Sequence, residues 1–408
     1  MPRINIKKLL LILLFFAVVI LIGYLIYKIF FASQIDQELE PTDVIQTTQT
    51  GGQLPDIGEG TGIVVDDSFK PTGLDITEEI VIPASTAITR PDKVGEPKIT
   101  SSIKPIVSTN GSDIQFYNKG DDRFYRIDNT GQITMLSDKK FYDVSNITWS
   151  PNKNKAILEY PDDRKVIYNF ETDEQISLPK HWEDFAFSPD GDQLVFKSMG
   201  LDTDNRWLAI VNSDGTKAQK IESIGINADS IIPSWSPNNQ IIAMMSEGAD
   251  FNHKNIYFIG LHGENFRMTT TEGRGFEPLW SPAGNRLLYS VYSSTENYLP
   301  RLWTVEAQGD NIGANRMPID LQTWAHKCTF VNNDEAYCAV PQSLEEGAGM
   351  FPMLAAGTND DLYKINIAYG TKSLIGKMDY DMSNLMVTED KEYLYFTDID
   401  NQLHRIEL

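Results

Sequence analysis

The chain has 408 residues, of which 41% are hydrophobic and 11% aromatic, which is enough apolar material for a sizeable core. This composition excludes a wholly disordered protein. The formal net charge is −22, and four cations with no acid among the first 33 residues leave −26 on the remainder. A surface so acidic, with no basic stripe, repels phosphate backbones, so we expect no nucleic-acid binding.

The N-terminus carries a long apolar run. Residues Leu9 to Tyr27 are uncharged, and cations precede them within residues 1–8. A helix of this length spans roughly 28 Å, close to the ~30 Å hydrocarbon core of a bilayer. Acids follow the run, so the sequence predicts a cytoplasmic segment 1–8, a transmembrane helix 9–31 that crosses the bilayer from Leu9 to Phe31, and an extracytoplasmic remainder. A cleaved signal peptide is the alternative, although its apolar core is usually shorter.

Residues 32–77 are rich in Thr, Gly, Asp, Glu, Gln and Pro and show no sustained hydrophobic period. Such a segment buries too little apolar surface to offset its chain entropy. We therefore expect a disordered linker over 32–77 and a folded domain over 78–408.

A repeat occupies the rest of the chain. An apolar run that ends in an aromatic residue is followed by Ser-Pro and a polar turn at four places, with Ser150, Ser188, Ser236 and Ser281 as the serines. Three degenerate copies have Ser108, Val331 and Thr388 at the serine position, so the intervals run from 38 to 57 residues. Each interval holds further β-rich runs separated by turn residues, which predicts four antiparallel strands per unit. The expected fold is an all-β, seven-bladed β-propeller with four-stranded antiparallel blades, in which the aromatic residues before the serines belong to the core.

The repeat resembles that of TolB-like β-propellers (the PD40, WD40-like repeat), which also occurs in the propeller domains of prolyl-oligopeptidase-type enzymes. The resemblance covers residues 105–408 and, with an N-terminal anchor, implies a membrane protein of the bacterial cell envelope. It specifies the fold and leaves the function open.

Motifs for catalysis are absent from the sequence. It contains no Gly-x-Ser-x-Gly nucleophile motif, HExxH, Walker loop, CxxC pair or EF-hand loop. His181 and His326 each precede an innermost strand, and Asp202, Asp204 and Asn205 share a loop, yet surface residues of these kinds are more often simply solvated than metal ligands. We expect a non-enzymatic protein without cofactor or metal.

Cys328 and Cys338 are the only cysteines, and they flank a turn centred near Asn333. A symmetric hairpin about that residue places the two cysteines opposite each other, where disulfide geometry is attainable. An extracytoplasmic compartment permits the oxidation. We predict a disulfide, with two reduced core thiols as the alternative.

One face of the propeller is expected to carry long, irregular loops, namely those that join second to third strands and those that link blades. Such loops are where binding function tends to lie. The face is predicted to present aromatic and arginine side chains typical of protein-binding hot spots, namely Trp182, Arg206, Arg274, Phe276, Tyr298 and Trp324. We interpret the protein as a non-catalytic scaffold for an unidentified protein or peptide partner; recognition of a glycan or small ligand, or an unrecognised envelope hydrolase or lyase, is the alternative.

The last blade contains only three strands before the chain stops at residue 408. The β-branched run at residues 79–83 has the composition of an edge strand and is bounded by Pro83. We therefore predict that residues 79–83 supply the closing strand of the last blade.

Overall fold

The computed structural model describes residues 101–408. The expected cytoplasmic segment, transmembrane helix, linker and closing strand lie outside the described residues. Within residues 101–408, no helix is long and apolar enough to cross a membrane.

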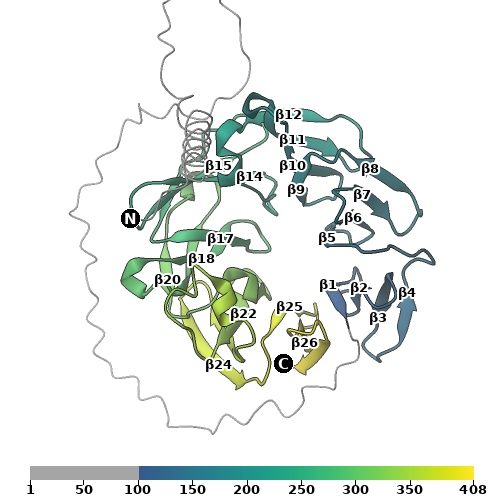
Figure 1. Cartoon of the computed structure of the whole chain (residues 1–408). Helices are drawn as coiled ribbons and strands as arrows, with labels where there is room; N and C mark the ends of the chain where they lie inside the picture. The colour runs from purple at the N-terminus through teal and green to yellow at the C-terminus, as the bar shows by residue number, and fades with distance from the viewer. Residues whose placement is uncertain (1–100) are drawn as a thin grey trace, which may run out of the picture. The chain divides into compact units, whose positions relative to one another are not determined.

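The described chain forms seven antiparallel sheets arranged in a ring, with the first and last sheets side by side (Figure 1). Blade 1 contains β1 (Ser102–Val107), β2 (Ile114–Asn118), β3 (Arg123–Ile127) and β4 (Ile133–Met135). Blade 2 contains β5 (Asn146–Trp149), β6 (Lys155–Glu159), β7 (Lys165–Asn169) and β8 (Gln175–Leu178). Blade 3 contains β9 (Trp182–Phe187), β10 (Gln193–Met199), β11 (Arg206–Asn212) and β12 (Gln219–Ser223).

Blades 4 to 7 continue the same order of strands from the centre of the ring outward. Blade 4 contains β13 (Ile231–Pro233), β14 (Ala243–Gly248), β15 (Lys254–Ile259) and β16 (Thr269–Thr271). Blade 5 contains β17 (Arg274–Trp280), β18 (Arg286–Tyr292), β19 (Pro300–Glu306) and β20 (Met317–Ile319). Blade 6 contains β21 (Cys328–Phe330), β22 (Glu335–Pro341), β23 (Asp360–Asn366) and β24 (Thr371–Lys377), and blade 7 contains β25 (Ser383–Val387), β26 (Tyr393–Thr397) and β27 (Leu403–Glu407).

The seven-bladed propeller predicted from the repeat is confirmed. The expectation of four strands in every blade holds for six blades, whereas blade 7 has three strands within residues 101–408. The three degenerate copies of the repeat also mark the ends of innermost strands, because β1, β21 and β25 stop one residue before Ser108, Val331 and Thr388.

A local hydrogen-bond pattern explains why the repeat favours a hydroxyl side chain at this position. The Ser188 backbone N–H donates to the Gln193 carbonyl oxygen at 2.9 Å, and the Gln193 N–H donates to Ser188 Oγ at 2.9 Å. Gly191 closes the turn with a left-handed φ of 76°, a conformation that costs glycine least. The same pair of bonds recurs at Ser150, Ser236, Ser281 and Thr388. The motif is therefore a turn that joins the first two strands of a blade.

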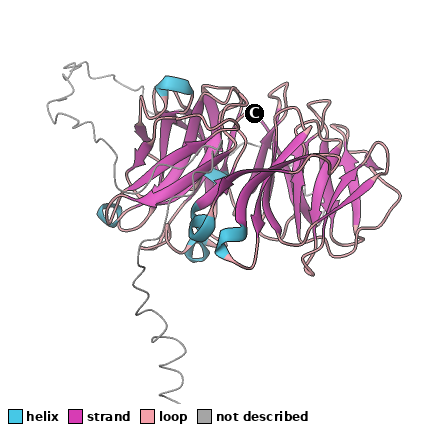
Figure 2. Cartoon of the chain, turned by 90° about the horizontal axis from the view of Figure 1, so that it is seen from above, coloured by secondary structure: helices cyan, strands magenta, loops and turns pink. Residues whose placement is uncertain are grey.

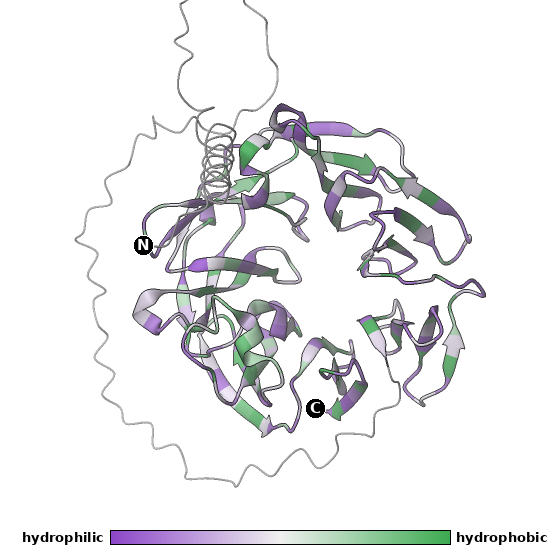
Figure 3. Cartoon of the chain, in the orientation of Figure 1, coloured by the Kyte–Doolittle hydropathy of each residue, from purple (hydrophilic) through white to green (hydrophobic). Residues whose placement is uncertain are grey.

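Neighbouring blades pack through apolar side chains of their facing strands. Blades 3 and 4, for example, share a cluster that contains Val195, Ile210, Ile231 and Trp235. Figure 3 shows hydrophobic residues along the strands and hydrophilic residues in many of the connecting loops. The core is consequently a series of layers between blades, and each layer depends on the residues that two blades contribute.

Candidate functional site

The loops that join second to third strands and the links between blades emerge on one face, because the strands alternate in direction. We call this face the loop face. It carries five short 3-10 segments, η2 (Thr203–Asn205), η3 (Gly225–Ser230), η4 (Ser294–Glu296), η6 (Ala325–Lys327) and η7 (Pro352–Ala355). Figure 2 shows several of the short helical segments along one rim of the propeller. The predicted asymmetry between a face of short turns and a face of longer loops is present, with the 18-residue segment 342–359 as the longest loop.

Exposed hydrophobic side chains concentrate on the loop face. Eight of the thirteen large hydrophobic residues that are exposed in the described chain belong to its loops, namely Tyr142, Leu201, Ile226, Phe251, Phe351, Met353, Leu354 and Ile399. Leu201, Met353 and Ile226 have relative exposures of 101%, 84% and 81%. They come from loops of several blades, and Phe351, Met353 and Leu354 share one loop. Exposed apolar side chains that gather on one face are candidate anchors for an interaction surface.

Two of the predicted hot-spot residues are not available to a partner. Phe276 is 9% exposed and packs between blades 4 and 5 beside Tyr289. Trp324 is 6% exposed and packs against Leu299, Leu344 and Ala348. The expectation that both rings face solvent is wrong, because Phe276 belongs to the layer between two blades and loop residues cover Trp324.

Trp182 and Arg206 are half-buried at the ends of β9 and β11. The Trp182 ring stacks on Phe196 with centroids 3.9 Å apart, so most of its surface supports the layer between blades 2 and 3. The Arg206 Nε donates to the Gly200 carbonyl oxygen at 3.3 Å, which holds the loop that carries Leu201. Both residues support the loop face and contribute little exposed surface to it.

Arg274 and Tyr298 are brought together. The Arg274 guanidinium carbon lies 4.8 Å from the Phe251 ring centroid, 5.7 Å from that of Tyr292 and 5.9 Å from that of Tyr298. Aromatic faces attract a guanidinium through their quadrupole. The predicted pair therefore forms a rigid aromatic and cationic group to which Phe251, more than half exposed, adds apolar surface.

A buried ion cluster fixes the end of the 342–359 loop. The Lys327 Nζ donates to Asp360 Oδ2 at 2.8 Å and to Asp381 Oδ1 at 2.9 Å. Asp381 accepts the Gly357 N–H at 2.8 Å, and Asp360 accepts the Met382 N–H at 2.6 Å. Burial raises the pKa of Asp360 to about 6, although Lys327 and the Met382 N–H act in the opposite direction. The loop that presents Met353 is thus anchored at its base.

Cys328 and Cys338 form a disulfide, with their Cα atoms 4.1 Å apart. They are directly opposed in the β21–β22 pair, the register that a hairpin symmetric about Asn333 requires. The bond joins β21 to β22, and β21 begins directly after Lys327, which belongs to the buried ion cluster.

The exposed loop residues Leu201, Ile226 and Met353 are absent from the sequence-based set of site residues. For Leu201 and Ile226 the signal is a large apolar residue beside glycine and polar residues, as in Gly200-Leu201-Asp202, whereas Met353 lies in the apolar run Phe351-Pro352-Met353-Leu354. Such a residue has no strand period to bury it. The sequence-based selection instead favoured Trp and Phe, whose size makes burial by a neighbouring loop favourable.

Among residues 101–408, no group of three or more His, Cys, Asp or Glu side chains is placed to hold a metal ion. His181 and His326 do not join a cluster of ligands, and His326 Nδ1 lies 2.7 Å from Glu277 Oε1. The sequence-based alternatives of a histidine metal site and of a calcium loop at Asp202 gain no support from this part of the chain.

The fold and the loop face define a seven-bladed β-propeller with an exposed, partly hydrophobic loop surface. No protein-family model matches the sequence, and no curated protein matches it. Among solved structures, the chain is similar to the tricorn protease, with a TM-score of 0.50 and 11% identity over 78% of this chain. The matched region spans about a third (34%) of the tricorn protease chain.

Two oligogalacturonate lyases are also similar in structure. The lyase in complex with manganese has a TM-score of 0.46 and 14% identity, over 76% of this chain and 89% of the lyase. The lyase from Vibrio parahaemolyticus has a TM-score of 0.46 and 11% identity, over 78% of this chain and 92% of the lyase. At 11% identity, the similarity to the tricorn protease shows the propeller fold alone. The resemblance to TolB-like propellers rests on the repeat.

Proposed function

We propose that this protein is a membrane-anchored, extracytoplasmic β-propeller that binds a protein partner on its loop face and does not catalyse a reaction. The observation that carries the proposal is the concentration of exposed hydrophobic side chains on that face. Apolar anchors that become desolvated on association supply most of the binding energy in protein interfaces.

The chemistry of these loops favours a basic, amphipathic protein segment over a lipid surface. The three loops that hold Leu201, Ile226 and Met353 contain five acids and no Lys or Arg, whereas Phe251 lies against the Arg274 guanidinium. Acidic side chains around apolar anchors repel anionic phospholipids and attract a cationic partner. The disulfide suits an oxidising compartment, and the TolB-like repeat together with the predicted anchor at residues 9–31 suits the bacterial envelope.

Site-specific photocrosslinking in the native cell tests the proposal with the full-length chain. A photoreactive amino acid at Met353 or Leu201 is expected to give a discrete covalent adduct with a protein. Tyr369 is the matched control, because it is also highly exposed but lies in the β23–β24 turn on the opposite face. We expect no adduct from that position.

The charged substitutions Met353→Glu and Leu201→Glu are expected to reduce the adduct formed at the other position at least about tenfold, because each places a carboxylate among apolar contacts. Unchanged adducts in these variants, or equal adducts from Tyr369, would contradict binding at the loop face. Adducts with lipid instead of protein would show that the loop face contacts the membrane, and would contradict a protein partner.

A further inference from the structure

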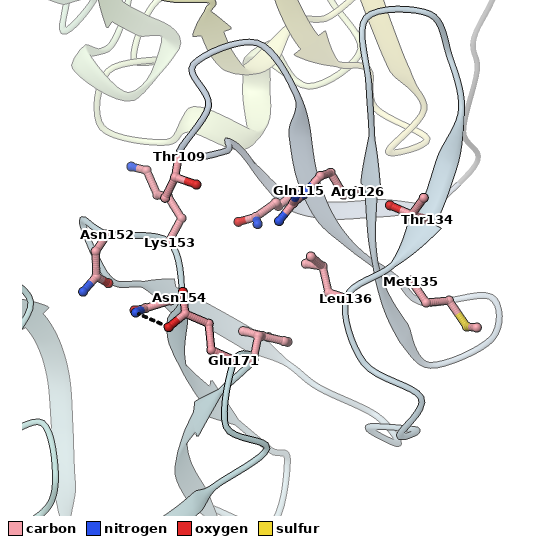
Figure 4. A pocket seen from close by; sticks show the side chains of 11 residues that line it. Thr109, Gln115, Arg126, Thr134, Met135, Leu136, Asn152, Lys153, Asn154 and Glu171 are labelled. Carbon is pink, nitrogen blue, oxygen red and sulfur yellow. Dashed lines mark hydrogen bonds between the residues drawn. The ribbon is translucent and has the colours of Figure 1, made fainter.

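A polar cavity of about 240 Å³ lies between blades 1 and 2, on the face opposite the loop face. Figure 4 shows Gln115 and Arg126 on blade 1 and Lys153, Asn154 and Glu171 on blade 2 around the same space. The space is larger than one or two bridging waters need and is open to solvent on one side, so a small ligand can enter it.

A polar residue lines this cavity at a position that is hydrophobic in other blades. Gln115 is the residue of the second strand that pairs with the residue two places before the Ser108 position. The residues with the same pairing in five other blades are Ile157, Val195, Leu288, Tyr337 and Tyr395. These hydrophobic side chains fill the layers between blades, whereas the 3% exposed Gln115 side chain places an amide there.

A row of polar side chains continues outward from Gln115 across blade 1. Gln115 pairs with Arg126 in the β2–β3 register, and Arg126 pairs with Thr134 in the β3–β4 register. Directly paired residues point to the same face of a sheet, so all three face blade 2. In blade 2 the corresponding row is Ile157, Ile167 and Ile176.

Three buried atoms at this cavity have no hydrogen-bond partner. They are Gln115 Oε1, Arg126 Nε and Asn154 Oδ1. Asn154 Nδ2 donates to Glu171 Oε2 at 3.2 Å, which leaves its oxygen as an acceptor. Protein groups therefore leave two acceptors and one cationic donor unsatisfied beside the cavity, and Glu171 adds a carboxylate to its lining. Each unsatisfied buried group costs stability.

Lys153 adds a second cation at the mouth of the cavity, in the turn between β5 and β6. Burial lowers the pKa of its ammonium group, and Glu389 opposes this effect. Lys153 and Arg126 are both half-buried, so an anion in the cavity would compensate two partly desolvated positive charges.

We infer that this cavity binds a small hydroxylated carboxylate such as a sugar acid, with Arg126 and Lys153 on the carboxylate and with Gln115 and Asn154 accepting hydrogen bonds from hydroxyl groups. The ligand supplies the donors and the acceptor that the buried atoms lack. A polar row that destabilises a core layer is expected where binding requires it. The site lies on the opposite face from the proposed protein-binding surface and does not depend on it.

Calorimetric titration of the purified full-length chain with glucuronate, glucose and acetate tests the site. Glucuronate is expected to bind at least about tenfold more tightly than glucose, which lacks the carboxylate, and than acetate, which lacks the hydroxyl groups. Gln115→Leu and Arg126→Leu are each expected to weaken glucuronate at least about tenfold. Arg123→Leu, on the same strand but the opposite sheet face, is the control and is expected to bind like the wild type.

Thermal melting separates binding from a structural role. Leucine occupies the equivalent position in blade 5 as Leu288, so Gln115→Leu is expected to raise the melting temperature while it weakens binding. Failure of all three ligands to bind, equal affinities for them, or glucuronate binding unchanged in both cavity variants would overturn the assignment. A fall in melting temperature for Gln115→Leu would show that the Gln115 side chain stabilises the fold.

Discussion

Asp360 is fully buried, and its surroundings shift the pKa of its carboxyl group in two opposite directions. Loss of water disfavours the carboxylate, while Lys327 at 2.8 Å and the Met382 N–H favour it. The net effect raises the pKa to about 6, so desolvation outweighs the ion pair. Buried ion pairs often contribute little net stability and are retained for the arrangement they specify. Here that arrangement is the anchored base of the 342–359 loop.

The first prediction concerns the pH dependence of Asp360. The folded-state pKa of about 6 exceeds the unfolded value of about 3.9, so the folded protein binds the extra proton. This contribution to stability is complete below about pH 4 and is lost as the pH rises through about 6. The free energy of unfolding of the wild type, measured by urea denaturation relative to Asp360→Asn, should fall by up to about 3 kcal/mol between pH 4 and 7.

Asp400→Asn is the matched control, because Asp400 is exposed in the β26–β27 turn. The difference between the wild type and this variant is expected to stay within about 0.5 kcal/mol over the same range. A pH-independent difference for Asp360→Asn would show that the carboxylate keeps its ordinary pKa in the folded protein.

At the scale of the element, blade 6 combines a short hairpin with the longest loop of the loop face. The hairpin is closed by the Cys328–Cys338 bond, and the loop covers Trp324 with Leu344, Ala348 and Ala355. The disulfide holds β21, and the loop covers the residues that lead into that strand. The loop that presents Met353 is therefore supported by covalent, ionic and apolar contacts.

The second prediction is that the cysteines of the unreduced protein do not react with an alkylating agent, even after unfolding in denaturant. Reduction should expose both thiols and lower the free energy of unfolding by roughly 2–3 kcal/mol, because a closed loop of this length limits the unfolded chain. The Cys328→Ala, Cys338→Ala double variant should show the same loss and no further response to reductant. Alkylation of the unfolded, unreduced wild type would refute the bond in the isolated protein.

Sequence reasoning succeeds for features whose cause is local. The turn after each innermost strand is set by hydrogen bonds within six residues, as between Ser188 and Gln193, so the motif locates every blade. The cysteine pairing follows from the same short hairpin geometry. Burial of Trp324 depends instead on the return of residues 342–359 across the face, and no pattern near Trp324 encodes that contact.

The cavity between blades 1 and 2 shows the same limit. Gln115 lies between Ile114 and Phe116 in β2, and its place in the layer emerges only when β2 is paired with β1 and β3. The residues that face it, Lys153 and Asn154, belong to the next repeat. A site between repeats requires the register of both blades.

At the scale of the whole molecule, the ring closes through contacts between blades 7 and 1. Met386, Tyr395 and Leu403 pack against Ile114 and Phe116. The Glu389 N–H donates to the Gly111 carbonyl oxygen at 2.8 Å. These contacts join innermost and middle strands, and no fourth strand lies beside β27 within residues 101–408.

The last prediction is that residues 79–83 complete blade 7. The Ser102 N–H donates to the Asn401 carbonyl oxygen at 2.8 Å, so the described chain begins against the turn that leads into β27. The 18 residues between positions 83 and 102 span at most roughly 60 Å when extended, ample for the preceding segment to reach the outer edge of that strand. An open edge strand invites pairing with another chain, and a segment of the same chain removes that hazard.

A protein that begins at residue 100 should therefore melt at least a few degrees below one that begins at residue 75, and it should aggregate more readily. Both lack the predicted anchor, so the comparison isolates residues 75–99. Ile80→Lys and Ile82→Lys in the longer protein place charges on one face of the predicted strand and should reproduce part of the loss, whereas Thr86→Lys, outside the strand, should not. Equal melting temperatures for the two lengths would contradict the closing strand. The ring would then be held by side-chain packing between blades 7 and 1 alone.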